Sequence, residues 1–400
     1  MNTKRITTEL DEAAALLKAG ALVAVPTETV YGLAGNGLDV AAVEKIYEVK
    51  GRPAVKPLSL MVPGMDAMEQ CCAEIPAAAR VLAERFWPGP LTIVLQAKDV
   101  VPEMVRAGGH TVGLRCPDHP ATLETLRRAG VPFAAPSANP SGEPSPKSAE
   151  DVLRYFDGQI AAVIDGGPCG IGKESTIVDL STVPYRVLRE GALPAQKIWD
   201  TLLDSMTIIG ITGGTGCGKT TALMALKEQG ALLLDCDAVY HTLLETNAEL
   251  RAEIDRQFPG VIVDGILDRK RLGTRVFKDA EALRVLSEIT HRYVRQELEN
   301  RLADWAKQGG RLAAIDAIAL VESGVDQLCN TVIGITAPRE TRIRRIMARE
   351  GITEAYAAAR VDAQKSNEWY AEHCDQILEN NGTLEEFASA CQKLILEVVK

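Results

Sequence analysis

The chain has 400 residues, which is too long for one ordinary hydrophobic core and predicts two domains. Its net charge of −10 weighs against a protein that coats nucleic acid, so we expect no direct DNA binding. Nine cysteines without a Cys-x-x-Cys pair favour reduced thiols, and the lack of a signal peptide or a membrane-long apolar run predicts a cytoplasmic protein without membrane contact.

The first half mixes short apolar strands with helical stretches, which predicts an α/β domain. A proline-rich loop at 136–146 interrupts it. The predicted helices cover 8–19, 40–50 and 194–204, and the predicted strands cover 21–26, 91–96, 111–115, 161–165 and 176–180.

A boundary follows the predicted helix at 194–204. Met206 comes next and opens an apolar strand that leads into a glycine-rich loop. Free-standing proteins with such a loop typically begin in this way, so Met206 is interpreted as the former start of a second gene. The alternative is an internal methionine that lies there by chance. The sequence thus predicts domains at 1–204 and 205–400.

The second half alternates apolar strands with longer helical segments. This alternation is typical of a parallel sheet with helices on both faces. The predicted strands are 207–211, 232–234, 312–315 and 331–335, and a helix is predicted over 222–229.

The glycine-rich loop satisfies the P-loop pattern in full, between a strand and a helix. Glycines let backbone N–H groups converge on phosphate oxygens, Lys219 adds a cation, and Thr220 offers a hydroxyl to Mg²⁺. ATP and Mg²⁺ are therefore expected here. The predicted ATP-binding residues are Gly213, Gly214, Thr215, Gly216, Cys217, Gly218, Lys219 and Thr220.

Other features narrow the class of P-loop protein to a small-molecule kinase. The sequence has neither the Asn-Lys-x-Asp element of GTPases nor the Leu-Ser-Gly-Gly-Gln signature of transport ATPases. Asp235 and Asp237 follow a strand whose end faces the ligand crevice of a parallel sheet, so either could act as a base or only cap a helix. Arg345 and Arg349 fit a lid over phosphates, or a solvated face.

Residues 207 to about 385 resemble dephospho-coenzyme A kinase. The matching stretches are the P-loop, 235–238, 264–269, His291, Arg345 with Arg349, the Arg360 to Gln364 spacing and 380–382. The resemblance implies that Asp237 is the base on the ribose 3′-hydroxyl of dephospho-CoA and that Lys219 holds phosphates. Together with the lid interpretation of Arg345, this gives Asp237, Lys219 and Arg345 as the predicted catalytic residues. Two departures are Ile318-Ala319-Leu320, where the family has Pro-Leu-Leu, and Arg292, where proline is common.

Polar residues of the first half cluster after strands and in loops. Lys50, Arg52 and Lys56 place three cations within seven residues, and could clasp a polyphosphate or form a solvated basic turn. Ser137 and Asn139 could bind a nucleotide or an amino acid, or only shape a turn. The residues alone indicate an anion or nucleotide pocket.

Residues 8 to about 195 resemble the bacterial threonylcarbamoyl-AMP synthase family, which has the YrdC/Sua5 fold, a twisted mixed sheet with helices. The matching stretches are 26–33, Lys50-x-Arg52-Pro53, 86–92, 115–117, 136–142, 174–176 and 188–191. The resemblance implies condensation of L-threonine, bicarbonate and ATP, with the product passed to tRNA-modifying transfer proteins. It implies ATP binding by Lys50, Arg52, Ser137, Asn139 and Arg189, and threonine binding by Thr27, Arg115 and Ser175.

Alternatives from other functional classes remain open at this point. The first half could be an RNA- or ribosome-binding module, although its acidic balance and few aromatic residues weigh against this. A related fold handles carbamoyl groups in hydrogenase maturation, but with zinc-finger segments that this sequence lacks. The second half could be a different small-molecule kinase.

Overall fold

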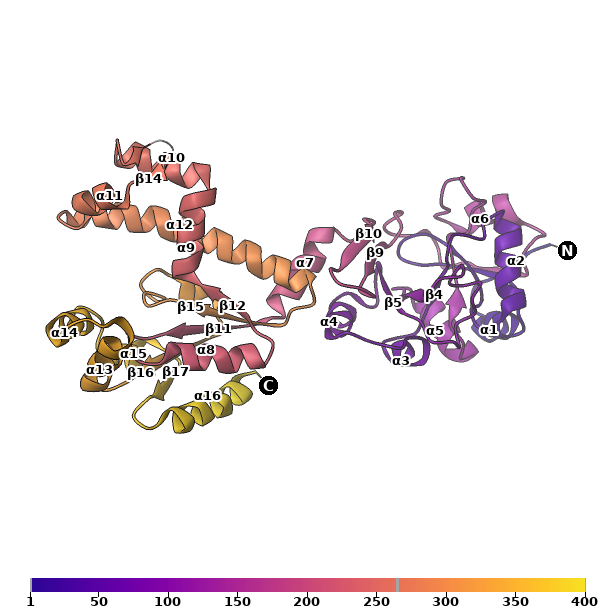
Figure 1. The fold of residues 1–400 in the computed structure, drawn as a ribbon. Helices are drawn as coiled ribbons and strands as arrows, with labels where there is room; N and C mark the ends of the chain where they lie inside the picture. The colour runs from indigo at the N-terminus through magenta and orange to yellow at the C-terminus, as the bar shows by residue number, and fades with distance from the viewer. Residues whose placement is uncertain (1, 264–265, 400) are drawn as a thin grey trace. The chain divides into compact units, whose positions relative to one another are not determined.

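The structure is a computed structural model that describes residues 2–263 and 266–399. It divides into two compact units (Figure 1). Unit 1 runs to Asp204 and includes 307–309, and unit 2 comprises Ser205–Ala306 and the residues from Gly310 onward. The motif residues Asp264 and Gly265 lie outside the described residues.

Unit 1 is built on a ten-stranded mixed sheet in which both parallel and antiparallel pairs occur. This confirms the predicted α/β class and the mixed sheet. In sheet order the strands are β1 (Lys4–Ile6), β8 (Ala162–Ile164), β2 (Val23–Val25), β3 (Gly32–Asn36), β7 (Phe133–Ala134), β4 (Ser59–Met61), β6 (Thr111–Arg115), β5 (Leu91–Gln96), β9 (Thr176–Asp179) and β10 (Arg186–Arg189).

Helices cover this sheet and complete its core. Helix α1 (Leu10–Lys18) and α5 (Pro120–Ala129) pack together and bury Leu17 and Leu126 against β2. The other helices of unit 1 are α2 (Val40–Lys50), α3 (Asp66–Cys71), α4 (Ala77–Phe86), α6 (Ala149–Phe156) and α7 (Ala195–Asp204).

Helix α2 ends in a way that matters for the site. Gly51 follows it in the left-handed conformation, with φ of 57°. Its N–H returns to the Glu48 carbonyl, which closes the helix and turns the chain sharply. Lys50 and Arg52 therefore leave the helix end in different environments: Lys50 is buried, whereas Arg52 is half-buried.

Unit 2 is built on a five-stranded sheet in which all strands are parallel. This confirms the parallel sheet predicted from the alternating pattern. In sheet order the strands are β12 (Leu232–Asp235), β15 (Leu312–Asp316), β11 (Thr207–Thr212), β16 (Thr331–Thr336) and β17 (Gln376–Glu379), and a separate hairpin pairs β13 (Ile262–Val263) with β14 (Ile266–Leu267).

The three central strands of this sheet, β15, β11 and β16, are buried on both faces, as the predicted layers require. On one face, Ile209 and Ile211 pack with residues of α8 (Lys219–Glu228) and α16 (Leu384–Val398). On the other face, Gly210 lies beneath Leu320 and Cys329. The central strand β11 leads directly into the P-loop, so the loop is fixed at the middle of the sheet.

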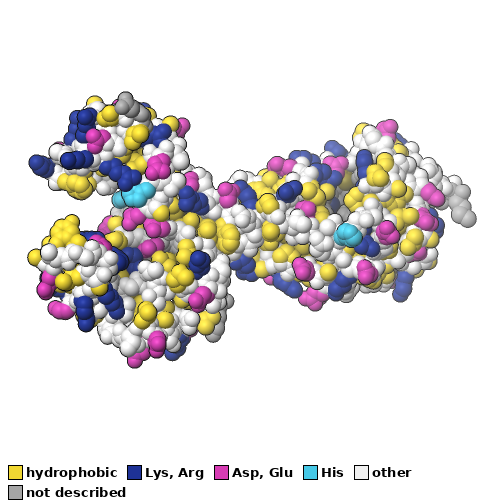
Figure 2. All heavy atoms as spheres, viewed as in Figure 1, with side chains coloured by type: hydrophobic (Ala, Val, Ile, Leu, Met, Phe, Trp, Pro, Cys, Tyr) yellow, Lys and Arg dark blue, Asp and Glu magenta, His cyan; other side chains and the backbone are white. Residues whose placement is uncertain are grey.

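The remaining helices extend unit 2 into two lobes with a hollow between them in the view of Figure 2. One lobe holds α10, α11 and part of α12, and the other holds the sheet with α13–α16. Within the described ranges, no helix combines the length and apolarity that a membrane crossing needs. The helices are α9 (Cys236–Thr246), α10 (Ala248–Gln257), α11 (Arg269–Val276), α12 (Ala280–Lys307), α13 (Arg339–Glu350), α14 (Glu354–Asp362) and α15 (Asn367–His373), with a 3-10 turn at Val325–Leu328.

Candidate functional sites

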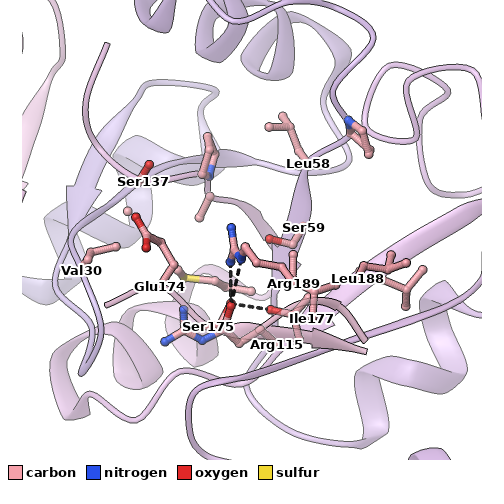
Figure 3. A pocket seen from close by; sticks show the side chains of 18 of the residues that line it. Val30, Leu58, Ser59, Arg115, Ser137, Glu174, Ser175, Ile177, Leu188 and Arg189 are labelled. Carbon is pink, nitrogen blue, oxygen red and sulfur yellow. Dashed lines mark hydrogen bonds between the residues drawn. The ribbon is translucent and has the colours of Figure 1, made fainter. Parts of the chain in front are cut away.

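Unit 1 contains a cavity of about 270 Å³ on one face of its mixed sheet (Figure 3). Alternate residues of β4, β5 and β6 point into it, because successive side chains of a strand face opposite sides. Five of the eight predicted ligand residues line it. They are Arg52, Arg115, Ser137, Ser175 and Arg189.

Three arginines make this cavity strongly basic. Burial lowers the pKa of Arg189, and the charges of Arg115 and Arg52 lower that pKa further, while Glu174 raises it. The guanidinium of Arg189 donates from Nε and Nη2 to the Ser175 carbonyl, at 3.1 and 2.8 Å (Figure 3). Cations held this close to one another favour a bound polyanion.

Arg115 is held from behind by a buried ion pair. Its Nη2 donates to Glu28 at 2.7 Å and to the Thr29 hydroxyl at 2.8 Å. The other oxygen of Glu28 accepts the N–H of Asp118 at 3.0 Å. The guanidinium therefore keeps one orientation at the cavity wall, and Glu28 acts as its support.

The other three predicted ligands, Lys50, Asn139 and Thr27, do not line the cavity. The Lys50 ammonium donates to the carbonyls of Ser137 and Asn139, and burial lowers its pKa to about 8. Asn139 donates to the Glu143 carbonyl at 2.7 Å, and the Thr27 hydroxyl to the Val30 carbonyl at 2.7 Å. Each of these side chains shapes a loop beneath the cavity.

Sequence reasoning did not assign a role to Glu174, which lines the cavity. Its Oε1 accepts the hydroxyl of Ser145 at 2.6 Å, and this bond holds the pKa of Glu174 below its usual value. Glu174 is thus an anion among three cations, and it links the long loop at 136–146 to the cavity. The signal that could have found it is its place beside Ser175 in the same motif.

Unit 2 contains a second cavity, of about 440 Å³, at the carboxyl end of its central strand. The P-loop residues Gly214, Thr215, Gly216, Gly218, Lys219 and Thr220 line it, together with Asp316, Ile318, Arg345, Arg349 and Arg360. Of the predicted loop residues, Gly213 and Cys217 do not. Gly213 offers its carbonyl to Lys219 at 3.2 Å, and Cys217 is buried with its carbonyl accepting from Asn380 at 2.8 Å.

The P-loop is a phosphate cradle by geometry. Gly218 is the N-cap of α8 with φ of 109°, and a Cβ atom there would lie 2.3 Å from the Asn380 amide nitrogen. Only glycine therefore lets the helix start at this point. The amides of its first turn face the cavity, where the helix dipole favours an anion. Helix α8 begins at Lys219, three residues earlier than predicted, so Lys219 and Thr220 lie in that turn.

Asp316 was missed by sequence reasoning and lies opposite the P-loop lysine. Its Oδ1 is 3.8 Å from the Nζ atom of Lys219 and has no hydrogen-bond partner among the described residues. Burial raises the pKa of this carboxyl to about 6, Lys219 opposes the rise, and Asp235 and Asp237 add to it. Its position directly after the predicted strand 312–315 was the available signal.

The two aspartates that the sequence could not separate have different surroundings. Asp235 is the N-cap of α9, and its Oδ1 accepts the N–H groups of Asp237 and Ala238 at 2.8 and 3.1 Å. Asp237 stands exposed in the first turn of that helix. Neither lines the cavity, but both carboxylates are near enough to raise the pKa of Asp316.

Arginines from helices α13 and α14 form the opposite wall of the cavity. Arg345 donates to the Asn380 side chain at 3.0 Å, which orients it over the P-loop. Arg349 and Arg360 both pair with Glu350. The structure thus brings the predicted pair Arg345 and Arg349 to the cavity wall and adds Arg360.

Comparisons with known proteins assign each unit to a family. A family model described as telomere recombination, for Sua5, YciO and YrdC, matches residues 15–191, and one described as dephospho-CoA kinase matches 207–386. A putative threonylcarbamoyl-AMP synthase of Mycobacterium tuberculosis is 38% identical over 196 residues, covering 48% of this chain and 89% of that protein. A dephospho-CoA kinase of Anaeromyxobacter dehalogenans is 38% identical over 195 residues, covering 48% of this chain and 92% of that protein.

The chain belongs to both families. A threonylcarbamoyl-AMP synthase of Pyrococcus abyssi is 49% identical over 186 residues, which is 46% of this chain. The chain covers 55% of the length of that relative, and it also covers 55% of a threonylcarbamoyl-AMP synthase of Bacillus subtilis, so it spans about half the length of these two synthases.

Replacing Lys50 should test whether its side chain stabilises the loop that carries Ser137 and Asn139. Lys50→Met leaves two buried carbonyls without their donor, so it should lower the free energy of unfolding of unit 1 by about 1–2 kcal/mol. Arg52 also donates to two backbone carbonyls, those of Lys56 and Pro57, but these bonds are exposed to solvent, so Arg52→Met should change stability much less. Urea unfolding of both full-length variants measures this. Equal stability of the two would show that Lys50 does not support the loop.

Replacing Asp316 should stabilise unit 2 at neutral pH. The folded state raises the pKa of this carboxyl to about 6, so its ionisation opposes folding above pH 6 and has no effect below pH 4. Asp316→Asn should therefore raise the free energy of unfolding by roughly 3 kcal/mol at pH 7.5 and by almost nothing at pH 4. Calorimetry of the full chain at both pH values measures the gain, and a gain independent of pH would contradict the assignment.

Proposed function

We propose that the chain is a bifunctional enzyme. Unit 1 would form threonylcarbamoyl-AMP and pyrophosphate from L-threonine, bicarbonate and ATP, and its product would pass to proteins that modify a tRNA adenosine. Unit 2 would use ATP to phosphorylate the ribose 3′-hydroxyl of dephospho-CoA. The observation that carries the proposal is a separate basic cavity in each unit, within residues that match the two families.

In unit 1 the arginines would offset the repulsion between two anionic reactants. The amine of threonine bonds to the carbon of bicarbonate, and a C–O bond breaks to release water and leave a carbamate. An oxygen of this carbamate then bonds to the α-phosphorus of ATP as the bond to the pyrophosphate leaving group breaks. Both reactants are anions, so their approach is opposed by repulsion. Arg52 and Arg189 offset it along the phosphates, while Arg115 holds the threonine carboxylate, with Ser137 and Ser175 donating hydrogen bonds. The cavity lies within unit 1 and supports a site that works without the kinase.

In unit 2 the groups that would bind the phosphates converge on the second cavity. The amides at the start of α8 and the Lys219 ammonium hold phosphate oxygens, and Arg345 stabilises the charge that spreads over the transferred group. Asp237 would accept the proton of the 3′-hydroxyl. The use of the Asp235 carboxylate as a helix cap supports Asp237 rather than Asp235 in this role.

The donor set of unit 2 also fits a magnesium ion that accompanies ATP. Asp316 presents a buried oxygen without a hydrogen-bond partner among the described residues, and the Thr220 side chain lines the same cavity. Hard oxygen donors of this kind are what Mg²⁺ prefers, with phosphates completing its coordination. When bound, the ion neutralises phosphate charge. Within the described ranges, no three His, Cys, Asp or Glu side chains gather as a metal site.

We also propose that the domains separate at residue 204. A fragment of residues 206–400 should be soluble and should phosphorylate dephospho-CoA at the rate of the full chain. An active full chain beside an inactive, insoluble fragment would refute independent domains.

The two activities should be lost one at a time. Lys219→Ala removes the P-loop cation, so it should abolish phosphorylation of dephospho-CoA and leave threonine-dependent pyrophosphate release unchanged. Arg52→Ala should do the reverse, because it weakens the unit 1 cavity alone. Phosphorylation of dephospho-CoA and threonine-dependent pyrophosphate release are measured on each purified variant. Loss of both activities in either variant would mean that the two reactions share one site.

Asp237→Asn should lower kcat for dephospho-CoA phosphorylation by about 10² or more, because a positioned base contributes roughly 10² to 10⁴ in rate. ATP affinity should persist through Lys219 and Thr220. Asp235→Asn is the matched control: it should lower kcat less and cost about 1 kcal/mol of stability as a weakened helix cap. A larger loss of kcat in Asp235→Asn would reverse the assignment.

A further inference from the structure

One side chain joins the P-loop to the arginine-bearing helices of unit 2. Gln364, two residues beyond the end of α14, makes two hydrogen bonds to Thr215 across 149 residues of sequence. Its Oε1 accepts the backbone N–H of Thr215 at 2.9 Å, and its Nε2 donates to the Thr215 hydroxyl at 2.9 Å. Both the main chain and the side chain of a cavity-lining P-loop residue are thereby fixed.

Gln364 is itself fixed by a buried cation. Arg342 of α13 is 5% exposed and donates from Nη2 to the Oε1 atom of Gln364 at 2.5 Å. Its Nε donates to the Thr215 carbonyl at 3.0 Å. A Cβ atom on Gly214 would lie 2.0 Å from this guanidinium, so the glycine leaves the space that Arg342 occupies. The residues Gln364, Arg342 and Thr215 thus form a closed hydrogen-bond network.

The same network lies at the base of the helices that carry the phosphate-facing arginines. Arg345 and Arg349 belong to α13, and Arg360 belongs to α14. Arg339 at the start of α13 makes two bonds of 2.7 Å to Asp362 at the end of α14. The helix pair therefore meets the P-loop as one body, through Arg342 and Gln364.

We propose that Gln364 is a positioning residue for the nucleotide in unit 2. It holds Thr215 so that the P-loop amides keep their phosphate-binding arrangement. It also fixes the position of that loop relative to the arginines of α13 and α14. The inference rests on the proposed function of unit 2 as an ATP-dependent kinase. Gln364 touches no reacting atom, so its effect appears first in nucleotide affinity.

The test is Gln364→Met in the full chain, because methionine has similar length without polar atoms. The readouts are the Kd for a non-hydrolysable ATP analogue with Mg²⁺, by calorimetry, and kcat for dephospho-CoA. We expect Kd to rise about tenfold, which corresponds to the loss of roughly one to two hydrogen bonds, with a lower kcat as well. Gln296→Met, on the exposed surface of α12, is the matched control and should leave Kd unchanged.

Two further variants separate positioning from general stability. Gln364→Glu keeps an acceptor for the Thr215 N–H and for Arg342, and the Thr215 hydroxyl can donate to it, so it should restore Kd to within about threefold. Thr215→Val removes only the hydroxyl bond. It should raise Kd less than Gln364→Met does, and combining the two should add nothing further, because they break the same contact.

The outcomes are distinct. A Kd in Gln364→Met equal to that in Gln296→Met overturns the inference, as does additivity of Thr215→Val with Gln364→Met. Should Gln364→Met fail to fold, Thr215→Val and Gln364→Glu still decide through their Kd values. If the wild-type chain binds the analogue but does not phosphorylate dephospho-CoA, the proposed activity is refuted. The proposed role of Gln364 is tested independently, by the Kd values of the variants.

Discussion

A cation buried beneath a loop, with backbone carbonyls as its acceptors, is the interaction on which both sites depend. In unit 1 the Lys50 ammonium holds the carbonyls of Ser137 and Asn139. In unit 2 the Arg342 guanidinium holds the carbonyl of Thr215. An anion-binding loop must direct its N–H and O–H groups toward the ligand, which leaves carbonyls on the inner side. A buried cation satisfies those carbonyls and makes the loop rigid before the ligand arrives.

The sequence predicted the fold class of both units, because their longest elements are local and strongly patterned. Helix α2 and strands β5 and β6 have the predicted bounds, and both sheet types were expected. The P-loop could be read directly, since its chemistry lies in eight consecutive residues. Eight short strands were not predicted: β1, β3, β4, β7, β10, β13, β14 and β17. β3 contains two glycines and is held in place by pairing with β2 and β7, so the strand propensity of its own residues does not predict it.

The site of unit 1 was less predictable, because residue type does not tell which way a side chain points. Lys50 and Arg52 look equivalent in the sequence, yet the left-handed Gly51 between them sends one into the interior and the other to the cavity. Asp316 was missed for a related reason. A single aspartate at a strand end has no motif of its own, and only pairing between β15 and β11 brings it opposite Lys219.

Each cavity also keeps one carboxylate among its cations, and the two carboxylates differ in their ionisation. A hydrogen bond from Ser145 holds the pKa of Glu174 below its usual value, which favours the charged carboxylate. Burial raises the pKa of Asp316 to about 6, so its charge is costly to maintain without a partner. At neutral pH, Glu174 therefore offsets part of the positive charge of the arginines of unit 1. Asp316 instead carries an unfavourable charge, which the magnesium ion proposed for unit 2 would relieve.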